Sequence, residues 1–155
     1  MDMNAGLELL APAAEQGWGE RPALRCAGES FSYARLTRQA HQVAHALHAL
    51  GLRPEERVLF LLPDSPEFVT LYLGVLLVGA VPVGFNLRAG AEELGFIVED
   101  SQPRLVLLDP ATFPLWQAAA STLETPPALA CWEVVPTARE GHGAHNPRNT
   151  SVRSE

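Results

Sequence analysis

The clearest periodic segment of the chain lies between residues 36 and 51. Its apolar positions recur every three or four residues, at Leu36, Ala40, Val43, Ala44, Leu47 and Leu50. This spacing is typical of an amphipathic helix. Gly51 comes directly after it, and a glycine at that place favours a helix end. The pattern predicts one helix with a buried face and a solvated face.

Two shorter elements are expected before this helix. Leucine and alanine residues between positions 7 and 14 indicate a short amphipathic helix that ends near Gly17. Residues 23–26 and 30–32 flank the turn-like sequence Ala27-Gly-Glu29, which predicts a small hairpin.

Downstream, short apolar runs alternate with helical patterns. We expect strands at 57–62, 81–83 and 104–108, and helices at 64–78 and 89–98. The sequence Asp64-Ser-Pro-Glu67 supplies a capping side chain, a proline suited to the first helical position and an acid for the positive helix end. Strand, helix, strand, helix, strand predicts the α/β class, with a partial parallel sheet of βαβαβ units flanked by helices.

The helix after Pro66 is apolar on every side, so we expect neighbours to cover all its faces. Gly74 would let those neighbours approach closely, and Gly79 would end the helix. A further helix at 112–123 and a strand at 130–135 complete the expected elements.

Three regions follow from these patterns. Residues 1–20 form an N-terminal helical segment, residues 21–135 form the α/β domain, and residues 136–155 form a tail. Glycine, proline, serine, asparagine and arginine dominate the tail and leave no apolar period, so we expect it to be disordered.

Composition narrows the function classes. The 155 residues carry a net charge of −7, and every basic residue is arginine because the sequence contains no lysine. An acidic chain without a basic stripe argues against nucleic-acid binding. The uncharged run from Phe68 to Leu87 has the length of a membrane span. Gly79, Pro82 and Gly84 interrupt it, so a buried helix followed by a buried strand explains it better, and no membrane span is expected.

Several residue sets are candidate sites. His41, His45 and His48 share a helix face at a spacing known from metal sites, but they lie opposite the apolar stripe and have no third ligand, which favours a solvated stripe. Gly74 and Gly79 fit no phosphate-binding loop. No Ser/His/Asp arrangement is supported by a strained nucleophile turn.

The cysteine and acidic residues are also expected to have structural or surface roles. Cys26 and Cys131 lie far apart without a CxxC spacing, so we expect a buried structural thiol at Cys26 and a reducing, cytoplasmic compartment. Four acids on one predicted helix are expected to be solvated surface charges: Glu92, Glu93, Glu99 and Asp100. No catalytic, cofactor-binding or metal-binding residue is therefore assigned.

Five segments, in this order and spacing, carry a family resemblance. They are Phe31-Ser-Tyr-Ala-Arg-Leu36, Leu50-Gly-Leu-Arg-Pro-Glu-Glu-Arg-Val-Leu59, Pro63-Asp-Ser-Pro-Glu-Phe68, Val78-Gly-Ala-Val-Pro-Val-Gly-Phe-Asn86 and Glu92-Glu-Leu-Gly-Phe-Ile-Val-Glu-Asp-Ser101. Together they resemble the N-terminal region of the adenylate-forming acyl-CoA synthetases, the AMP-dependent synthetase/ligase family. The resemblance covers residues 20–110 well and 111–135 loosely, and places them in the N-terminal portion of that family's large domain.

The resemblance implies a carboxylic acid–CoA ligase that uses ATP, magnesium and coenzyme A in its full-length form. The family's phosphate-binding loop, its later substrate-binding segments and its lysine-bearing C-terminal domain are not among these 155 residues. Arginine does not replace the lysine equivalently. We therefore expect no cofactor and no activity for this chain alone, and the family's site residues are not transferred to it.

Three hypotheses remain open. The chain is a truncated ligase fragment, a subunit of a split ligase whose other chain supplies the remaining parts, or a non-catalytic binding module. Exposed apolar surface and an open sheet edge would favour either the missing ligase chain or self-association as partner. The acid, aromatic or fatty, is not specified by these residues.

Overall fold

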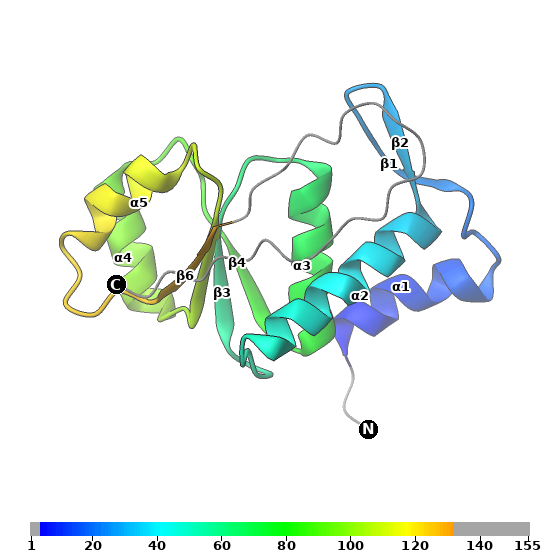
Figure 1. Ribbon diagram of the computed structural model, residues 1–155, viewed down its shortest axis with the longest axis horizontal. Helices are drawn as coiled ribbons and strands as arrows, with labels where there is room; N and C mark the ends of the chain where they lie inside the picture. Colours follow the sequence, from blue (N-terminus) through cyan, green and yellow to red (C-terminus); the bar gives the residue numbers. More distant parts are fainter. Residues whose placement is uncertain (1–3, 132–155) are drawn as a thin grey trace. The chain divides into compact units, whose positions relative to one another are not determined.

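In the computed structural model, which describes residues 4–131, the chain divides into two units (Figure 1). The first comprises Met1–Val58 with Pro63–Pro82, and the second comprises Leu59–Leu62 with Val83–Glu155. The predicted disordered tail, 136–155, lies outside the described residues.

The first unit consists of three helices and a hairpin. The amphipathic pattern near the N-terminus forms α1, the long periodic segment forms α2, and the apolar segment after Ser65 forms α3, so all three predicted helices are confirmed. The strands β1 and β2 pair antiparallel as the predicted hairpin. Their bounds are α1 Ala5–Glu15, β1 Pro22–Cys26, β2 Glu29–Ser32, α2 Tyr33–Ala49 and α3 Pro66–Val78.

Side-chain caps explain where these helices begin. Ser32 Oγ accepts a hydrogen bond from the Arg35 amide at 3.3 Å, and Ser65 Oγ accepts one from the Phe68 amide at 3.1 Å. Each satisfies a backbone donor that the first helical turn leaves unpaired. Gly79 ends α3 with a φ of 83°, which is strained for any residue with a Cβ. The predicted start and end of α3 are confirmed.

Two glycines set how closely these helices pack. A Cβ built on Gly74 of α3 would lie 2.3 Å from Val43 Cγ1 of α2. A Cβ on Gly6 of α1 would lie 2.7 Å from the Leu77 backbone nitrogen. Asn4 Nδ2 also donates to the Leu77 carbonyl at 3.1 Å. The close approach predicted for Gly74 is confirmed, while that of Gly6 was not predicted.

The expectation that α3 is covered on all faces is wrong. Only Thr70, Leu71, Gly74 and Val75 are buried among its residues, and Tyr72 is exposed. Helices α1 and α2 pack against α3 within this unit and leave part of its circumference open. The buried Thr70 hydroxyl donates to the Pro66 carbonyl at 2.9 Å, so its polar group is satisfied.

The second unit is built on sheet strands and two helices, α4 (Ala91–Ser101) and α5 (Phe113–Ala120). Its core consists of large apolar side chains from strands and helices together: Leu59, Leu61, Leu94, Val98, Val106, Leu108, Trp116 and Ala119. Helix α4 runs three residues beyond the predicted end at Val98. Gln102, in the left-handed conformation, stops it.

The four-stranded sheet has the order β4-β3-β5-β6, and β5 and β6 pair in parallel. The predicted α/β class with a parallel sheet is confirmed. The last strand begins two residues earlier than expected. The bounds are β3 Arg57–Leu61, β4 Val81–Gly84, β5 Leu105–Leu108 and β6 Ala128–Cys131.

Strand β4 is not the buried strand that the sequence predicted. Val81 is 42% exposed and Gly84 is exposed, because β4 stands at the end of the strand order and has one strand neighbour among the described residues. No described helix combines the length and the apolar character that crossing a membrane requires. The uncharged run 68–87 instead divides between α3 and β4.

Candidate functional site

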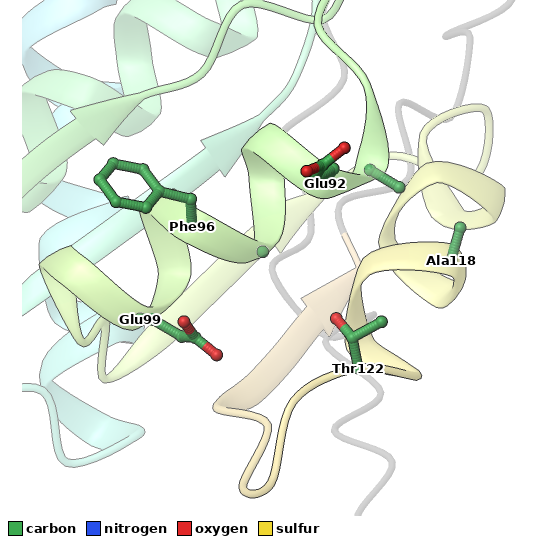
Figure 2. A pocket seen from close by; sticks show the side chains of 7 residues that line it. Glu92, Phe96, Glu99, Ala118 and Thr122 are labelled. Carbon is green, nitrogen blue, oxygen red and sulfur yellow. The ribbon is translucent and has the colours of Figure 1, made fainter.

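An open groove of about 380 Å³ lies on the second unit, where α4 and α5 pack side by side. Its lining comes from one face of α4 and from the end of α5: Ala91, Glu92, Gly95, Phe96, Glu99, Ala118 and Thr122. Figure 2 shows Phe96 projecting from α4 on the side away from Ala118 and Thr122. Three small residues, Ala91, Gly95 and Ala118, are part of the lining, and Gly95 is buried.

The polar groups of the groove are ordinary surface groups. Glu92 and Glu99 are exposed, as predicted for these acids. The Thr122 hydroxyl already donates to the Ala119 carbonyl at 2.8 Å. A Cβ on Gly95 would meet Thr122 Oγ1 at 3.6 Å, an ordinary contact distance. Among the residues that line the groove, no nucleophile is paired with a base.

The carboxyl ends of strands β3 and β5 are joined by Thr112, a link the sequence analysis missed. Thr112 Oγ1 donates to the Leu61 carbonyl at 2.7 Å, and the Thr112 amide donates to Asp109 Oδ1 at 2.9 Å. Ligands of α/β proteins usually bind at this edge of the sheet. Here the Thr112 and Asp109 side chains form hydrogen bonds with backbone groups of the protein. The sequence signal for this link was the turn-forming segment Asp109-Pro-Ala-Thr112.

A second open hollow, of about 480 Å³, follows strand β1 between Arg21 and Arg25. The Arg21 guanidinium stacks 5.6 Å above the Trp18 ring. In the neighbouring strand, Glu29 forms an ion pair with Arg35 at 2.6 Å. These contacts stabilise the hairpin and the start of α2, which is a structural role.

The other candidate residues lie on α2 and in the hairpin. His41, His45 and His48 are exposed on α2, and within residues 4–131 no group of histidine, cysteine and acidic side chains is placed to hold a metal. Cys26 is a free cysteine that is half-buried rather than buried, because it ends a strand of a two-stranded hairpin. The side chain of Cys131 lies outside the described set.

ATP does not fit the glycine positions. Val43 of α2 occupies the space beside Gly74. An ideal Cβ on Gly79 would lie 3.3 Å from Pro54 Cβ. Neither presents a row of free backbone amides to a phosphate, and the sequence has no lysine to pair with one. No reaction step can therefore be assigned to the described residues.

Comparison with known proteins identifies the family to which this fold belongs. Residues 11–151 match the family described as AMP-binding enzyme. The chain belongs to this family. The match begins inside α1 and extends past the described residues, so it includes both units.

Three relatives show which part of the family is present. A 3-hydroxybenzoate–CoA/4-hydroxybenzoate–CoA ligase of Thauera aromatica is 40% identical over 127 residues, which cover 82% of this chain and 24% of that protein. The long-chain-fatty-acid–CoA ligase FadD13 of Mycobacterium tuberculosis is 34% identical over 102 residues, covering 66% and 20% respectively. The solved N-terminal domain of FACL13 from Mycobacterium tuberculosis superimposes with a TM-score of 0.69 at 30% identity.

The chain thus spans about a quarter of the length of the curated relatives it matches. The superposition on the solved FACL13 N-terminal domain includes 81% of this chain but only 31% of that domain. The resemblance found in the five sequence segments is confirmed, and it concerns the N-terminal region of these ligases.

Proposed function

We propose that these residues are an N-terminal part of a carboxylic acid–CoA ligase and are catalytically silent by themselves. The observation that carries the proposal is the match at 40% identity over 82% of the chain to only 24% of a CoA ligase. Their contribution is a scaffold, in which the Thr112 link fixes strands β3 and β5 and the glycine contacts fix α1, α2 and α3.

The expected lack of catalytic activity in the isolated chain has a chemical reason. Formation of an acyl-adenylate, in which a carboxylate attacks the α-phosphate of ATP and displaces pyrophosphate, develops negative charge on phosphate oxygens, and cationic groups must be positioned against that charge. In residues 4–131 no basic side chain lines the α4–α5 groove, and the Arg21 guanidinium lies over the Trp18 ring. Magnesium, ATP and coenzyme A would be bound by parts of the ligase beyond these residues.

An aromatic acid is the substrate class we favour for the whole ligase. The hydroxybenzoate relative is more similar than the fatty-acid relative, at 40% against 34% identity, and it matches more of the chain. A cytoplasmic location belongs to the same proposal, because Cys26 is free and free thiols are typical of reducing compartments.

A hybrid enzyme tests the proposal. The aligned segment of the Thauera aromatica ligase is replaced by this chain's sequence, and ATP–pyrophosphate exchange is measured with 3-hydroxybenzoate and with a long-chain fatty acid. We expect exchange that depends on the aromatic acid. A folded hybrid without exchange contradicts the ligase assignment.

The chain alone is the matching control. Purified without the rest of a ligase, it should give no exchange with either acid above a heat-killed sample. The hybrid separates the alternatives, since a free-standing binding module predicts an inactive hybrid, whereas both alternatives predict an inactive isolated chain.

A further inference from the structure

We propose that Thr112 is a positioning residue of the ligase, whose hydroxyl holds the carboxyl ends of β3 and β5 at a fixed separation beside the reaction site. This inference rests on the proposed function and adds to it a residue and a place in the sheet. Three features of the described residues carry it: the order of the strands, the hydrogen bonds of Thr112, and the exposed segment that follows β3.

The strand order is the first feature. The sheet has the order β4-β3-β5-β6, so the chain leaves β3 toward β4 on one side and leaves β5 toward β6 on the other side. Connections that leave neighbouring parallel strands in opposite directions diverge at the carboxyl ends of those strands. Ligands of open α/β sheets bind at such a switch point. The topology therefore places a switch point between the ends of β3 and β5.

Thr112 bridges this switch point. Its hydroxyl donates to the carbonyl of Leu61, the last residue of β3, at 2.7 Å, although the two residues are 51 positions apart in the sequence. On the β5 side, the Thr112 amide donates to Asp109 Oδ1 at 2.9 Å, and the Asp109 amide donates to Thr112 Oγ1 at 3.3 Å. Asp109 comes directly after β5. One side chain therefore connects the two strand ends.

The Thr112 hydroxyl makes this bond instead of capping α5. Thr112 precedes the first residue of α5, where a threonine side chain usually accepts a hydrogen bond from an amide of the first turn. Within residues 4–131 its side chain forms no such bond, whereas Ser32 and Ser65 cap α2 and α3 in this way. A residue that departs from its local preference in favour of a distant contact is typical of a functional site.

The bond acts on the segment that follows β3. Leu61 and Leu62 are buried, whereas Pro63 and Asp64 are exposed, so the chain turns to the surface within two residues of the Thr112 contact. The Thr112 hydroxyl therefore fixes the point at which the chain leaves the sheet. Because a displacement of about 1 Å at a reaction site can lower a rate about 100-fold, a bond that fixes this point affects the rate of the ligase.

The experiment uses the hybrid ligase that carries this chain's sequence in the Thauera aromatica enzyme. ATP–pyrophosphate exchange with 3-hydroxybenzoate is measured as kcat and KM, at a temperature at which thermal unfolding shows every variant to be folded. Thr112→Val removes the hydroxyl and keeps the shape of the side chain, and it should lower kcat about tenfold with little change in KM. Thr112→Ser keeps the hydroxyl and should restore kcat to within about twofold of the wild-type hybrid.

Matched variants separate positioning from stability. The Thr70 hydroxyl is buried and donates to the Pro66 carbonyl at 2.9 Å, so Thr70→Val removes a hydroxyl hydrogen bond within one helix. This control should lower the unfolding temperature of the hybrid and leave kcat unchanged. Asp109→Ala removes the acceptor of the Thr112 amide and should also lower kcat. Asp109→Asn keeps an oxygen acceptor at that place and should restore kcat.

Loss of kcat in Thr112→Val and Asp109→Ala, with recovery in Thr112→Ser and Asp109→Asn, supports the positioning role. Unchanged kcat in Thr112→Val, an equal loss in Thr70→Val, or no recovery in Thr112→Ser overturns this role and leaves the proposed function intact. A folded wild-type hybrid without exchange contradicts the proposed function, and the positioning role with it. If Thr112→Val does not fold, the two Asp109 variants decide in the same way.

Discussion

Glycine has opposite roles in the two units of this chain. In the first unit, Gly6 and Gly74 lie at helix contacts where a Cβ would come within 3 Å of a neighbouring helix. In the second unit, Gly95 lies on the floor of a groove, and its nearest neighbour is 3.6 Å from the Cβ position. The first two glycines are required by the helix packing, and the third has space for a methyl group.

The cores of the two units also differ in how they are packed. The first unit is held by helices that approach one another closely. The second unit is held by large side chains from strands and helices, with Trp116 at 3% exposure among them. The first unit also carries four exposed large apolar side chains, Leu7, Leu9, Tyr72 and Val81, whereas Phe96 and Phe113 are exposed on the second. The difference teaches that close helix contacts stabilise the first unit and large buried side chains stabilise the second. Four stability measurements test this contrast.

The largest effect is expected in the core of the second unit. Trp116→Ala removes a buried ring and should lower the free energy of unfolding by about 3–5 kcal/mol, since both transfer energy and a cavity are involved. Urea unfolding measures the change. Phe113→Ala, at a residue that is 41% exposed on the same helix, is the control, and an equal loss in the two variants would contradict the packing described for α5.

The next effect tests the close contact of the first unit. Gly74→Ala places a methyl group 2.3 Å from Val43 Cγ1 and should cost about 1–3 kcal/mol of overpacking strain. Adding Val43→Ala should recover part of this loss, which a double-mutant cycle reveals as a coupling energy. Strict additivity of the two changes would mean that the residues do not share one contact.

A smaller effect is expected at the cap of α3. Ser65→Ala removes the acceptor of the Phe68 amide and should lower the free energy of unfolding by about 1 kcal/mol. The exposed Ser30 on β2 provides the comparison, because Ser30→Ala removes a hydroxyl without removing a helix cap. Urea midpoints that move equally in the two variants would argue against the capping role.

The smallest effect has the opposite sign. Gly95→Ala should raise the free energy of unfolding of the isolated chain by about 0.5–1 kcal/mol, because alanine is the better helix former and the site has space. A destabilised chain would show that Gly95 is as closely packed as Gly74.

Much of the fold followed from local signals in the sequence. The stripe from Leu36 to Leu47 specified α2, and Ser65, Pro66 and Gly79 specified the ends of α3. These residues act within one helix, so their pattern is visible without a partner. The parallel sheet followed from the alternation of strands and helices.

Other features depended on contacts between distant residues. The need for glycine at Gly6 arises from Leu77, and the role of Thr112 arises from the carbonyl of Leu61. The sequence analysis also predicted too much burial for β4 and for part of α3. An apolar pattern indicates that a surface favours burial, but it does not indicate which element covers that surface. The groove was missed for the same reason, since Phe96 and Thr122 come from separate elements.

The most direct test of the account is ATP–pyrophosphate exchange with 3-hydroxybenzoate, measured for the chain alone, for the remaining part of the Thauera aromatica ligase alone, and for the two together. The account predicts no exchange by either part and exchange by the mixture. Exchange by the chain alone, or a mixture that assembles and stays inactive, would contradict the claim that these residues are an N-terminal scaffold of an acid–CoA ligase.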